Sequence, residues 1–291
     1  MQGYILSCCS TADLTKEHFE KRDIKYIYFH YYLDGVEYPD DLGQTMPFEI
    51  FYEKMKNGAD TRTSQINVDE FVTYFEGFLK EGKDIVHVSL SSGISGVYNS
   101  AVGARDILAE QYPDRNIIII DSLCAASGYG LFMDALADKR DEGMSVSELA
   151  AWAEENKGKL KHWFFSSDLT HFVKGGRISR VSGFVGTLLK ICPLMHVSPE
   201  GKLVPKEKHR TTKNAIKAAF GKMVEEARDG DAYNGKCYIS HSACYDDAKA
   251  LADLIEEHFE SLDGKVEIKS IGTTIGSHTG PGTVALFYWS K

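Results

Sequence analysis

The stretch Asp84-Ile85-Val86-His87-Val88-Ser89-Leu90-Ser91-Ser92-Gly93-Ile94-Ser95-Gly96 predicts an apolar strand that ends in a hydroxyl-rich turn. Residues 97–112 follow with apolar side chains at helical spacing, so the unit is a strand, a turn and a helix. Ligands of open α/β sheets bind beyond the carboxyl ends of the strands, where helix N-termini also present free N–H groups. The turn therefore predicts a site for a ligand with a polar or anionic head.

A second unit of the same kind favours a parallel sheet. Residues 116–121 contain four consecutive isoleucines, which is typical of a strand buried on both faces, and a small-residue turn follows at 121–128. Residues 4–8 predict another strand, and 24–33 predict one more, joined to 36–38 through the hairpin turn Asp34-Gly35. We expect residues 1–160 to form an α/β domain with a mainly parallel sheet flanked by helices.

The pattern changes after residue 160. Pro199-Glu200-Gly201 separates two short strand candidates as a hairpin turn does, and helices are expected over 182–191 and 211–228. Hairpins mixed with helices are typical of an antiparallel sheet. We expect residues 161–291 to form a smaller α/β domain with a mainly antiparallel sheet, and the ligand site to lie at strand ends between the two domains.

Composition excludes several classes of function. The 291 residues carry a formal net charge of -9 without a basic block, so binding to nucleic acid is not expected. No apolar run reaches the roughly 18 residues of a membrane span, and the first residues do not resemble a signal peptide, which favours the cytoplasm. The six cysteines form no Cys-x-x-Cys pair and no Cys/His group of ligand spacing, so neither a metal nor a cofactor is expected.

Three segments are dense in hydroxyl groups. They are Thr61-Arg62-Thr63-Ser64-Gln65, the turn at 91–96, and the run 272–282, which we expect to be a stiff, glycine-rich turn. One such loop is usually only a turn, but three that border predicted strands favour a shared ligand site. Neutral donors of this kind suit a carboxyl group held by several hydrogen bonds.

A second hypothesis, an enzyme, lacks the motifs that it would require. A serine hydrolase or a phosphotransferase could use Ser92 or Ser95, but the elbow pattern Gly-x-Ser-x-Gly fails because Val97 stands at its second glycine. The dinucleotide fingerprint fails at Met133, and the run 275–282 lacks the Gly-Lys-Ser/Thr of a phosphate loop. A basic segment at 174–180 has two interpretations, a helix end or a positive edge that docks a partner.

Together these segments resemble the DegV family of bacterial fatty-acid-binding proteins, from Ile5 to the end of the chain. The matching motifs are Ser10-Thr11-Ala12-Asp13, Thr63-Ser64-Gln65, Ser91-Ser92-Gly93-Ile94-Ser95-Gly96-Val97-Tyr98, Lys174-Gly175-Gly176-Arg177-Ile178-Ser179 and Ile275-Gly276-Ser277-His278-Thr279-Gly280-Pro281-Gly282. The resemblance implies a parallel α/β domain followed by a smaller α/β domain, and a bound long-chain fatty acid such as palmitate. It also implies a protein without catalytic residues of its own.

The resemblance assigns roles to individual residues. Thr63 and Ser95 would hold the carboxylate, with Ser64, Ser92 and His278 close by. Better-understood members of the family present the bound fatty acid to a separate kinase subunit, which phosphorylates the carboxylate. Arg177 and its neighbours would be candidates for contact with such a kinase.

The chain departs from the family pattern at three places. Cys8-Cys9 stand where Thr-Asp is usual, Ile66 stands where proline is usual, and Cys192 replaces a lysine. These departures raise a third hypothesis, a protein that docks a partner and whose pocket is vestigial. The three hypotheses differ in what they predict: a co-purifying fatty acid, turnover by the isolated chain, or neither.

Overall fold

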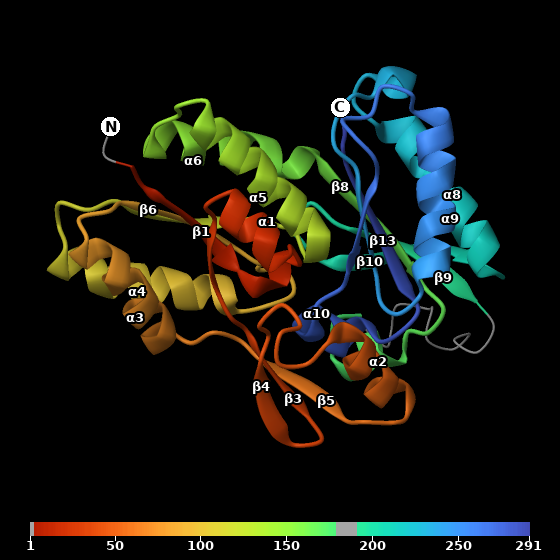
Figure 1. Ribbon diagram of the computed structural model, residues 1–291, viewed down its shortest axis with the longest axis horizontal. Helices are drawn as coiled ribbons and strands as arrows, with labels where there is room; N and C mark the ends of the chain where they lie inside the picture. The colour runs from red at the N-terminus through yellow and green to blue at the C-terminus, as the bar shows by residue number, and fades with distance from the viewer. Residues whose placement is uncertain (1–2, 179–190) are drawn as a thin grey trace.

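A computed structural model of the chain describes residues 3–178 and 191–291. The helix expected over 182–191 falls almost wholly outside these residues. The described chain contains three sheets, and Figure 1 shows the parallel sheet and the large antiparallel sheet on opposite sides of helix α5.

The first sheet is parallel throughout, as the isoleucine-rich strand predicts. Its strand order is β2 (Lys25–Ile27), β1 (Ile5–Cys9), β6 (Ile85–Ser89) and β7 (Ile117–Asp121). Every residue of β6 is buried, because helices cover both faces of the sheet. The short helices η1 (Ser10–Ala12) and α1 (Lys16–Lys21) follow β1.

Helices lie on both sides of this sheet in Figure 1, with α3 (Val68–Lys80) and α4 (Val97–Gln111) on one side and α5 (Ala126–Asp141) and α6 (Val146–Asn156) on the other. Capping boxes begin α3 at Asn67 and α6 at Ser145, each with a glutamate three residues later. Both boxes can be recognised in the sequence, because the paired residues stand three positions apart. A single turn, η2 (Lys157–Lys159), leads out of this layer.

The second sheet is antiparallel except for one strand pair. Its order is β10 (Leu203–His209), β9 (Cys192–Val197), β8 (Leu160–Ser166), β13 (Thr283–Trp289), β11 (Tyr238–His241) and β12 (Glu267–Ser270), with β11 and β12 parallel. Helices α8 (Thr212–Glu226) and α9 (Tyr245–His258) lie on its outer side, with η4 (Gly230–Ala232) between them in sequence (Figure 1). The mainly antiparallel character predicted for this half is confirmed. The division into domains at residue 160 stays a prediction.

Helix α5 joins the parallel sheet with its helices, the first layer, to the antiparallel sheet with its helices, the second layer. Eleven of its sixteen residues are buried, which is why its sequence lacks the polar stripe of a surface helix. Its Asp134 is buried and pairs with Arg22 and His18 on the first layer and with Lys236 on the second. These partners hold the pKa of Asp134 well below its usual range despite the burial. One apolar core extends from the parallel sheet through Phe132 of α5 to Phe164 of β8, and a second lies on the other face of the antiparallel sheet.

A third, small sheet corrects one prediction. Residues 24–33 are not one strand: β2 pairs in the parallel sheet, whereas β3 (His30–Leu33) pairs with β4 (Val36–Pro39) and β5 (Thr61–Ser64). The chain bends between them because the amide of Phe29 donates to the hydroxyl of Ser10, which ties the bend to the end of β1. Helix α2 (Phe48–Lys56) packs its aromatic side chains on this sheet.

The glycine-rich run 272–282 also differs from expectation. It contains a helix, α10 (Thr273–Thr279), which ends at Gly280 with a φ of 68°. A bulkier residue at Gly276 would collide with Tyr52, since an added Cβ lies 2.4 Å from its hydroxyl oxygen. Glycine here serves close packing against α2, which composition alone does not distinguish from a turn. The short helix α7 (Thr170–Lys174) lies beside α10.

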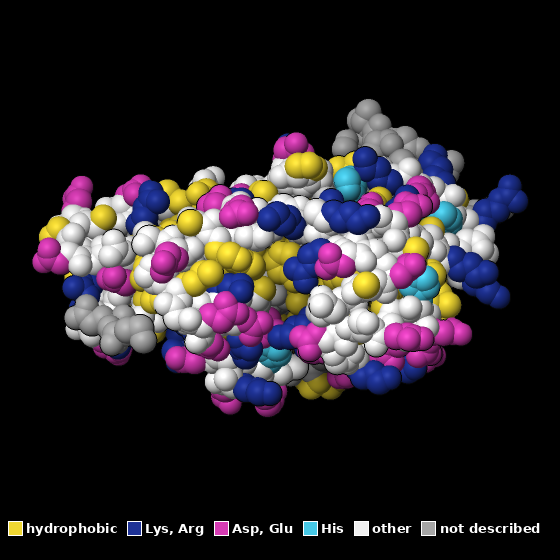
Figure 2. Space-filling view, turned by 90° about the horizontal axis from the view of Figure 1, so that it is seen from above, with side chains coloured by type: hydrophobic (Ala, Val, Ile, Leu, Met, Phe, Trp, Pro, Cys, Tyr) yellow, Lys and Arg dark blue, Asp and Glu magenta, His cyan; other side chains and the backbone are white. Residues whose placement is uncertain are grey.

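The surface carries no extended field of one sign on the face in Figure 2, where basic and acidic side chains alternate. Among the helices formed by residues 3–178 and 191–291, none is both long and apolar enough to cross a bilayer.

Candidate functional site

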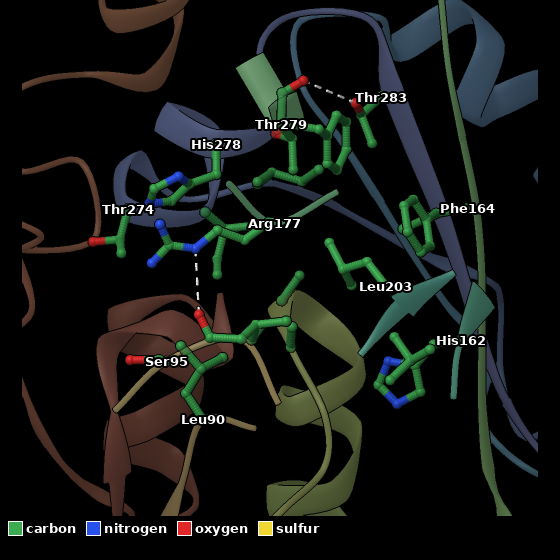
Figure 3. A pocket seen from close by; sticks show the side chains of 18 of the residues that line it. Leu90, Ser95, His162, Phe164, Arg177, Leu203, Thr274, His278, Thr279 and Thr283 are labelled. Carbon is green, nitrogen blue, oxygen red and sulfur yellow. Dashed lines mark hydrogen bonds between the residues drawn. The ribbon is translucent and has the colours of Figure 1, made fainter. Parts of the chain in front are cut away.

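A cavity opens where the three hydroxyl-rich segments meet. It encloses about 750 Å³, including its open mouth, and Figure 3 shows the side chains that line it. Most of them are apolar and come from all parts of the fold: Phe29, Leu90, Ile94, Phe164, Phe172, Val197, Leu203, Ile271, Ile275 and Phe287. Each of the three segments contributes to the wall, so the structure brings them together as expected.

Thr63 and His278 meet at the polar end of the cavity. The hydroxyl oxygen of Thr63, on β5, lies 2.7 Å from Nε2 of His278, on α10. The hydroxyl of Thr61 donates to the carbonyl of Ser277 at 3.3 Å, which fastens α10 to β5 and sets this geometry. Both Thr63 and His278 line the cavity, as the resemblance implies.

His278 is neutral in this position. Burial, then the nearby Arg177 and His171, lower the pKa of His278 to about 3. Its Nδ1 is buried and has no hydrogen-bond partner among the described residues. The backbone of Gly175 presses on the ring, because an added Cβ at Gly175 would lie 2.2 Å from Nδ1. The ring is thus held in place with one nitrogen on Thr63.

Ser95 lines the same cavity from the turn after β6. Its hydroxyl oxygen accepts from the amide of Val97 at 3.2 Å, so the hydroxyl hydrogen is free to point into the cavity. The turn is anchored to the antiparallel sheet through Ser91, whose hydroxyl donates to the carbonyl of Gly201 at 2.8 Å. Gly93 lies against the same hairpin, since an added Cβ would come within 2.5 Å of the carbonyl oxygen of Glu200.

Arg177 lines the cavity instead of extending from the surface. Its guanidinium donates to the carbonyl of Gly175 at 2.6 Å and to that of Ile94 at 3.3 Å. Figure 3 shows the bond to Ile94 as a dashed line. Burial lowers its pKa, but arginine remains charged in proteins. A positive charge therefore faces the polar end of the cavity.

Ser64 and Ser92 do not line the cavity. Ser92 is exposed, and its amide donates to the carboxylate of Asp121 at 3.0 Å. Ser64 follows Thr63 on β5, and side chains of neighbouring strand residues point to opposite faces. Contact of these two serines with a ligand remains a prediction that the lining does not support.

Several lining residues were missed by the sequence analysis. His162 and Phe164 of β8, and Thr283, Ala285 and Phe287 of β13, form one wall. Their alternate spacing shows that they share one face of the sheet. Alternation of this kind could have predicted that these residues share a face of the sheet. It could not have predicted that the face borders a cavity.

The departures from the family pattern lie in the core. Cys8, Cys9, Ile66 and Cys192 are all buried, and none lines the cavity. Burial raises the pKa of the Cys9 thiol to about 12, which keeps it protonated and unreactive. The substitutions therefore leave the polar end of the cavity intact.

The site has the groups of a binding pocket. None of the described lining residues is an aspartate or a glutamate, and no histidine bonds to Ser92 or Ser95 within residues 3–178 and 191–291. The same residues contain no cluster of three or more His, Cys, Asp or Glu side chains suited to a metal ion. Hydroxyls, a neutral imidazole and a guanidinium next to an apolar cavity suit an amphipathic anion.

Comparison with known proteins identifies the family. A family model described as an uncharacterised protein of the DegV family matches residues 9–291. The chain belongs to the DegV family. The DegV domain-containing protein CPE0026 of Clostridium perfringens is 37% identical over 288 residues, which cover 99% of this chain and 98% of that protein. The DegV domain-containing protein YteA of Lactococcus lactis is 32% identical over 97% of this chain and 96% of its own length.

Solved DegV structures share the fold over the whole chain. Protein TM841 of Thermotoga maritima, described as revealing a fatty acid binding function, is 27% identical with a TM-score of 0.82, and all of both chains is covered. DegV of Bacillus subtilis, described as a fatty acid binding protein, is 26% identical with a TM-score of 0.84 and the same full coverage.

Proposed function

We propose that this protein binds a long-chain fatty acid such as palmitate, with the carboxyl group at Thr63 and Ser95 and the acyl chain in the apolar cavity. The observation that carries the proposal is the Thr63–His278 pair, a fixed polar end on an otherwise apolar cavity. The fatty acid binding described for the relatives from Thermotoga maritima and Bacillus subtilis supports it.

The polar end can hold a carboxylate through neutral donors. With the proton of the neutral imidazole on Nε2, His278 donates to Thr63, and the Thr63 hydroxyl is then free to donate to the ligand. Ser95 offers a second hydroxyl, and Arg177 supplies the compensating charge. Hydrogen bonds to a charged acceptor are the stronger kind, about 1.5–3 kcal/mol each.

The acyl chain would supply most of the affinity. Thr283, Ala285 and Phe287 line the cavity at alternate positions of β13, so the wall extends for about 13 Å along the strand. Each methylene taken from water contributes about 0.8 kcal/mol, and a C16 tail contributes on the order of 10 kcal/mol before ordering costs. Hydroxyls at one end then set the direction of the chain.

We assign the protein a carrier role, in which it presents the fatty acid to a separate kinase subunit and catalyses no step itself. None of the described lining residues offers a carboxylate, or a histidine paired with a serine, as a general base. All six cysteines are unpaired, which fits a reducing compartment such as the cytoplasm. Residues 1–160 and 161–291 would act as two domains around the ligand.

Extraction of the purified protein, followed by mass spectrometry, tests the binding. We expect a C14–C18 fatty acid to co-purify, and delipidated protein to take up palmitate in stoichiometric amount. If neither happens, the carrier role is wrong and the result supports the hypothesis of a vestigial pocket. Turnover of acyl esters, or of ATP with palmitate, by the isolated chain would instead support the enzyme hypotheses.

A further inference from the structure

A histidine stands in the apolar wall of the cavity, away from its polar end. His162 on β8 pairs in register with Phe287 of β13, and both side chains line the cavity. Four residues further along the two strands, Ser166 pairs with Thr283. His162 therefore lies about 13 Å from the Thr283 end of the wall. Figure 3 shows it across the cavity from His278 and Thr274.

The surroundings of His162 are apolar. Its ring packs edge-on against Phe287, with centroids 5.1 Å apart, and Phe164 lies two residues along the same strand face. The side chain is buried, and burial lowers its pKa to about 3, so the imidazole is neutral. A neutral imidazole has one donor and one acceptor nitrogen to satisfy.

One of these nitrogens has no partner. Nε2 of His162 is buried and forms no hydrogen bond with any of residues 3–178 and 191–291. Leaving a buried polar atom unpaired is unfavourable, and leucine or phenylalanine at this position would avoid that cost. Because the ring lines the cavity, this unpaired atom makes His162 a candidate for ligand contact.

The ring is also held in one place. An added Cβ at Gly128 of α5 would lie 2.5 Å from Cε1 of His162 and 2.4 Å from Phe287. The backbone of α5 at Gly128 therefore packs directly against both rings and leaves them little room to rotate. A polar group fixed in this way can select ligands by the position of their matching group.

We propose that His162 recognises a hydroxyl group on the distal half of the acyl chain, so that hydroxy fatty acids are preferred ligands of this cavity. The proposal rests on the fatty acid binding proposed above and specifies the class of acid. A hydroxyl buried among apolar side chains alone would lose its hydrogen bonds to water. Opposite His162 it gains a partner, and the unpaired imidazole nitrogen gains one as well.

Competition binding with delipidated protein tests this preference. The probes are octadecanoic acid and its 8-, 10-, 12-, 14- and 16-hydroxy derivatives, each displacing the same fluorescent fatty acid. We expect one position to bind about tenfold more tightly than its isomers, and His162→Phe to abolish that difference. His196→Phe is the matched control, because His196 stacks on Trp163 of the same sheet and does not line the cavity.

A second measurement does not depend on a variant. In wild-type protein with ¹⁵N-labelled histidine, the preferred hydroxy acid should shift the His162 imidazole resonances, whereas octadecanoic acid should leave them unchanged. Affinities that do not depend on hydroxyl position, or a preference that survives His162→Phe, would overturn the proposal. Failure of octadecanoic acid itself to bind would instead overturn the fatty acid binding on which it rests.

Discussion

The hydroxyl oxygen of Thr63 lies 2.7 Å from Nε2 of His278, although 215 positions separate the two residues. Thr63 belongs to the small sheet and His278 to a helix that precedes the last strand of the chain. The pair closes the polar end of the cavity. Disturbing either residue should therefore affect ligand binding more than folding.

Replacing Thr63 by valine should weaken palmitate binding. The variant keeps the shape of the side chain but loses the hydroxyl donor, at a cost of about 1–3 kcal/mol, or roughly 5- to 150-fold in affinity. Displacement of a fluorescent fatty acid by palmitate measures the change. Thr73→Val is the control, since Thr73 is exposed on α3 and its hydroxyl donates to the carbonyl of Asp69. Equal affinities for the two variants would remove Thr63 from the site.

Ser95→Ala and Ser92→Ala separate two serines of one turn. Ser95 lines the cavity and Ser92 is exposed, so we expect only Ser95→Ala to lower palmitate affinity, by a factor of about 5 or more. The same displacement assay applies. A larger effect at Ser92 would contradict the placement of the carboxyl group.

Gly128→Ala should shorten the preferred acyl chain. The added methyl would push Phe287 and His162 toward the cavity, because the ideal Cβ lies 2.4 Å and 2.5 Å from them. Overpacking of this kind also costs about 1–3 kcal/mol of stability. Affinities for saturated C12 to C18 acids measure the shift, and Gly221→Ala, whose Cβ meets nothing within 4 Å, is the control. An unchanged chain-length profile would place the end of the acyl chain elsewhere.

His87 should make the protein less stable in acid. Burial lowers the pKa of His87 to about 3, from about 6.5 in the unfolded chain, so the unfolded state binds the additional proton between these values. Stability is then lost as the pH falls from about 6.5 toward 3, by up to about 1.4 kcal/mol per pH unit. His87→Phe, packed between Phe71 and Phe75, should reduce this slope in urea unfolding at several pH values. Parallel curves for the two proteins would show that His87 does not titrate as inferred.

Asp13→Asn should stabilise the protein at neutral pH. The carboxylate of Asp13 is buried against Gly272, and burial followed by the charge of Asp40 raises its pKa well above the usual range. The folded state keeps a proton that the unfolded chain releases near pH 4, so this contribution is lost as the pH rises. The advantage of asparagine in thermal unfolding should therefore be larger at pH 7 than at pH 4.

Asp13→Ala checks the backbone at the same position. Asp13 has a φ of 49°, a conformation that is less costly for asparagine than for alanine. Alanine should lose about 1–2 kcal/mol relative to asparagine at both pH values. A stability order that reverses with pH would contradict this account.

Local signals in the sequence were sufficient for many elements. The capping boxes at Asn67 and Ser145 act through residues three positions apart, and the isoleucine run of β7 reports burial on both faces. Such signals depend on neighbours in sequence, so they could be predicted without a fold. Helix α10 was not predicted because its glycines are equally typical of a turn. The reason for glycine at position 276, its close packing against Tyr52, is visible only in the folded protein.

The sequence by itself determined the α/β class, the change from a parallel to an antiparallel sheet, the family, and the hydroxyl-rich segments that meet at the cavity. Only the tertiary structure decided which side chains face that cavity: Thr63, Ser95 and His278 do, whereas Ser64 and Ser92 do not. It also turned Arg177 inward and placed His162 in the apolar wall. The physical reason is that composition and spacing report the residue types of a segment, whereas the direction of a side chain depends on strand register and on contacts between residues far apart in the chain.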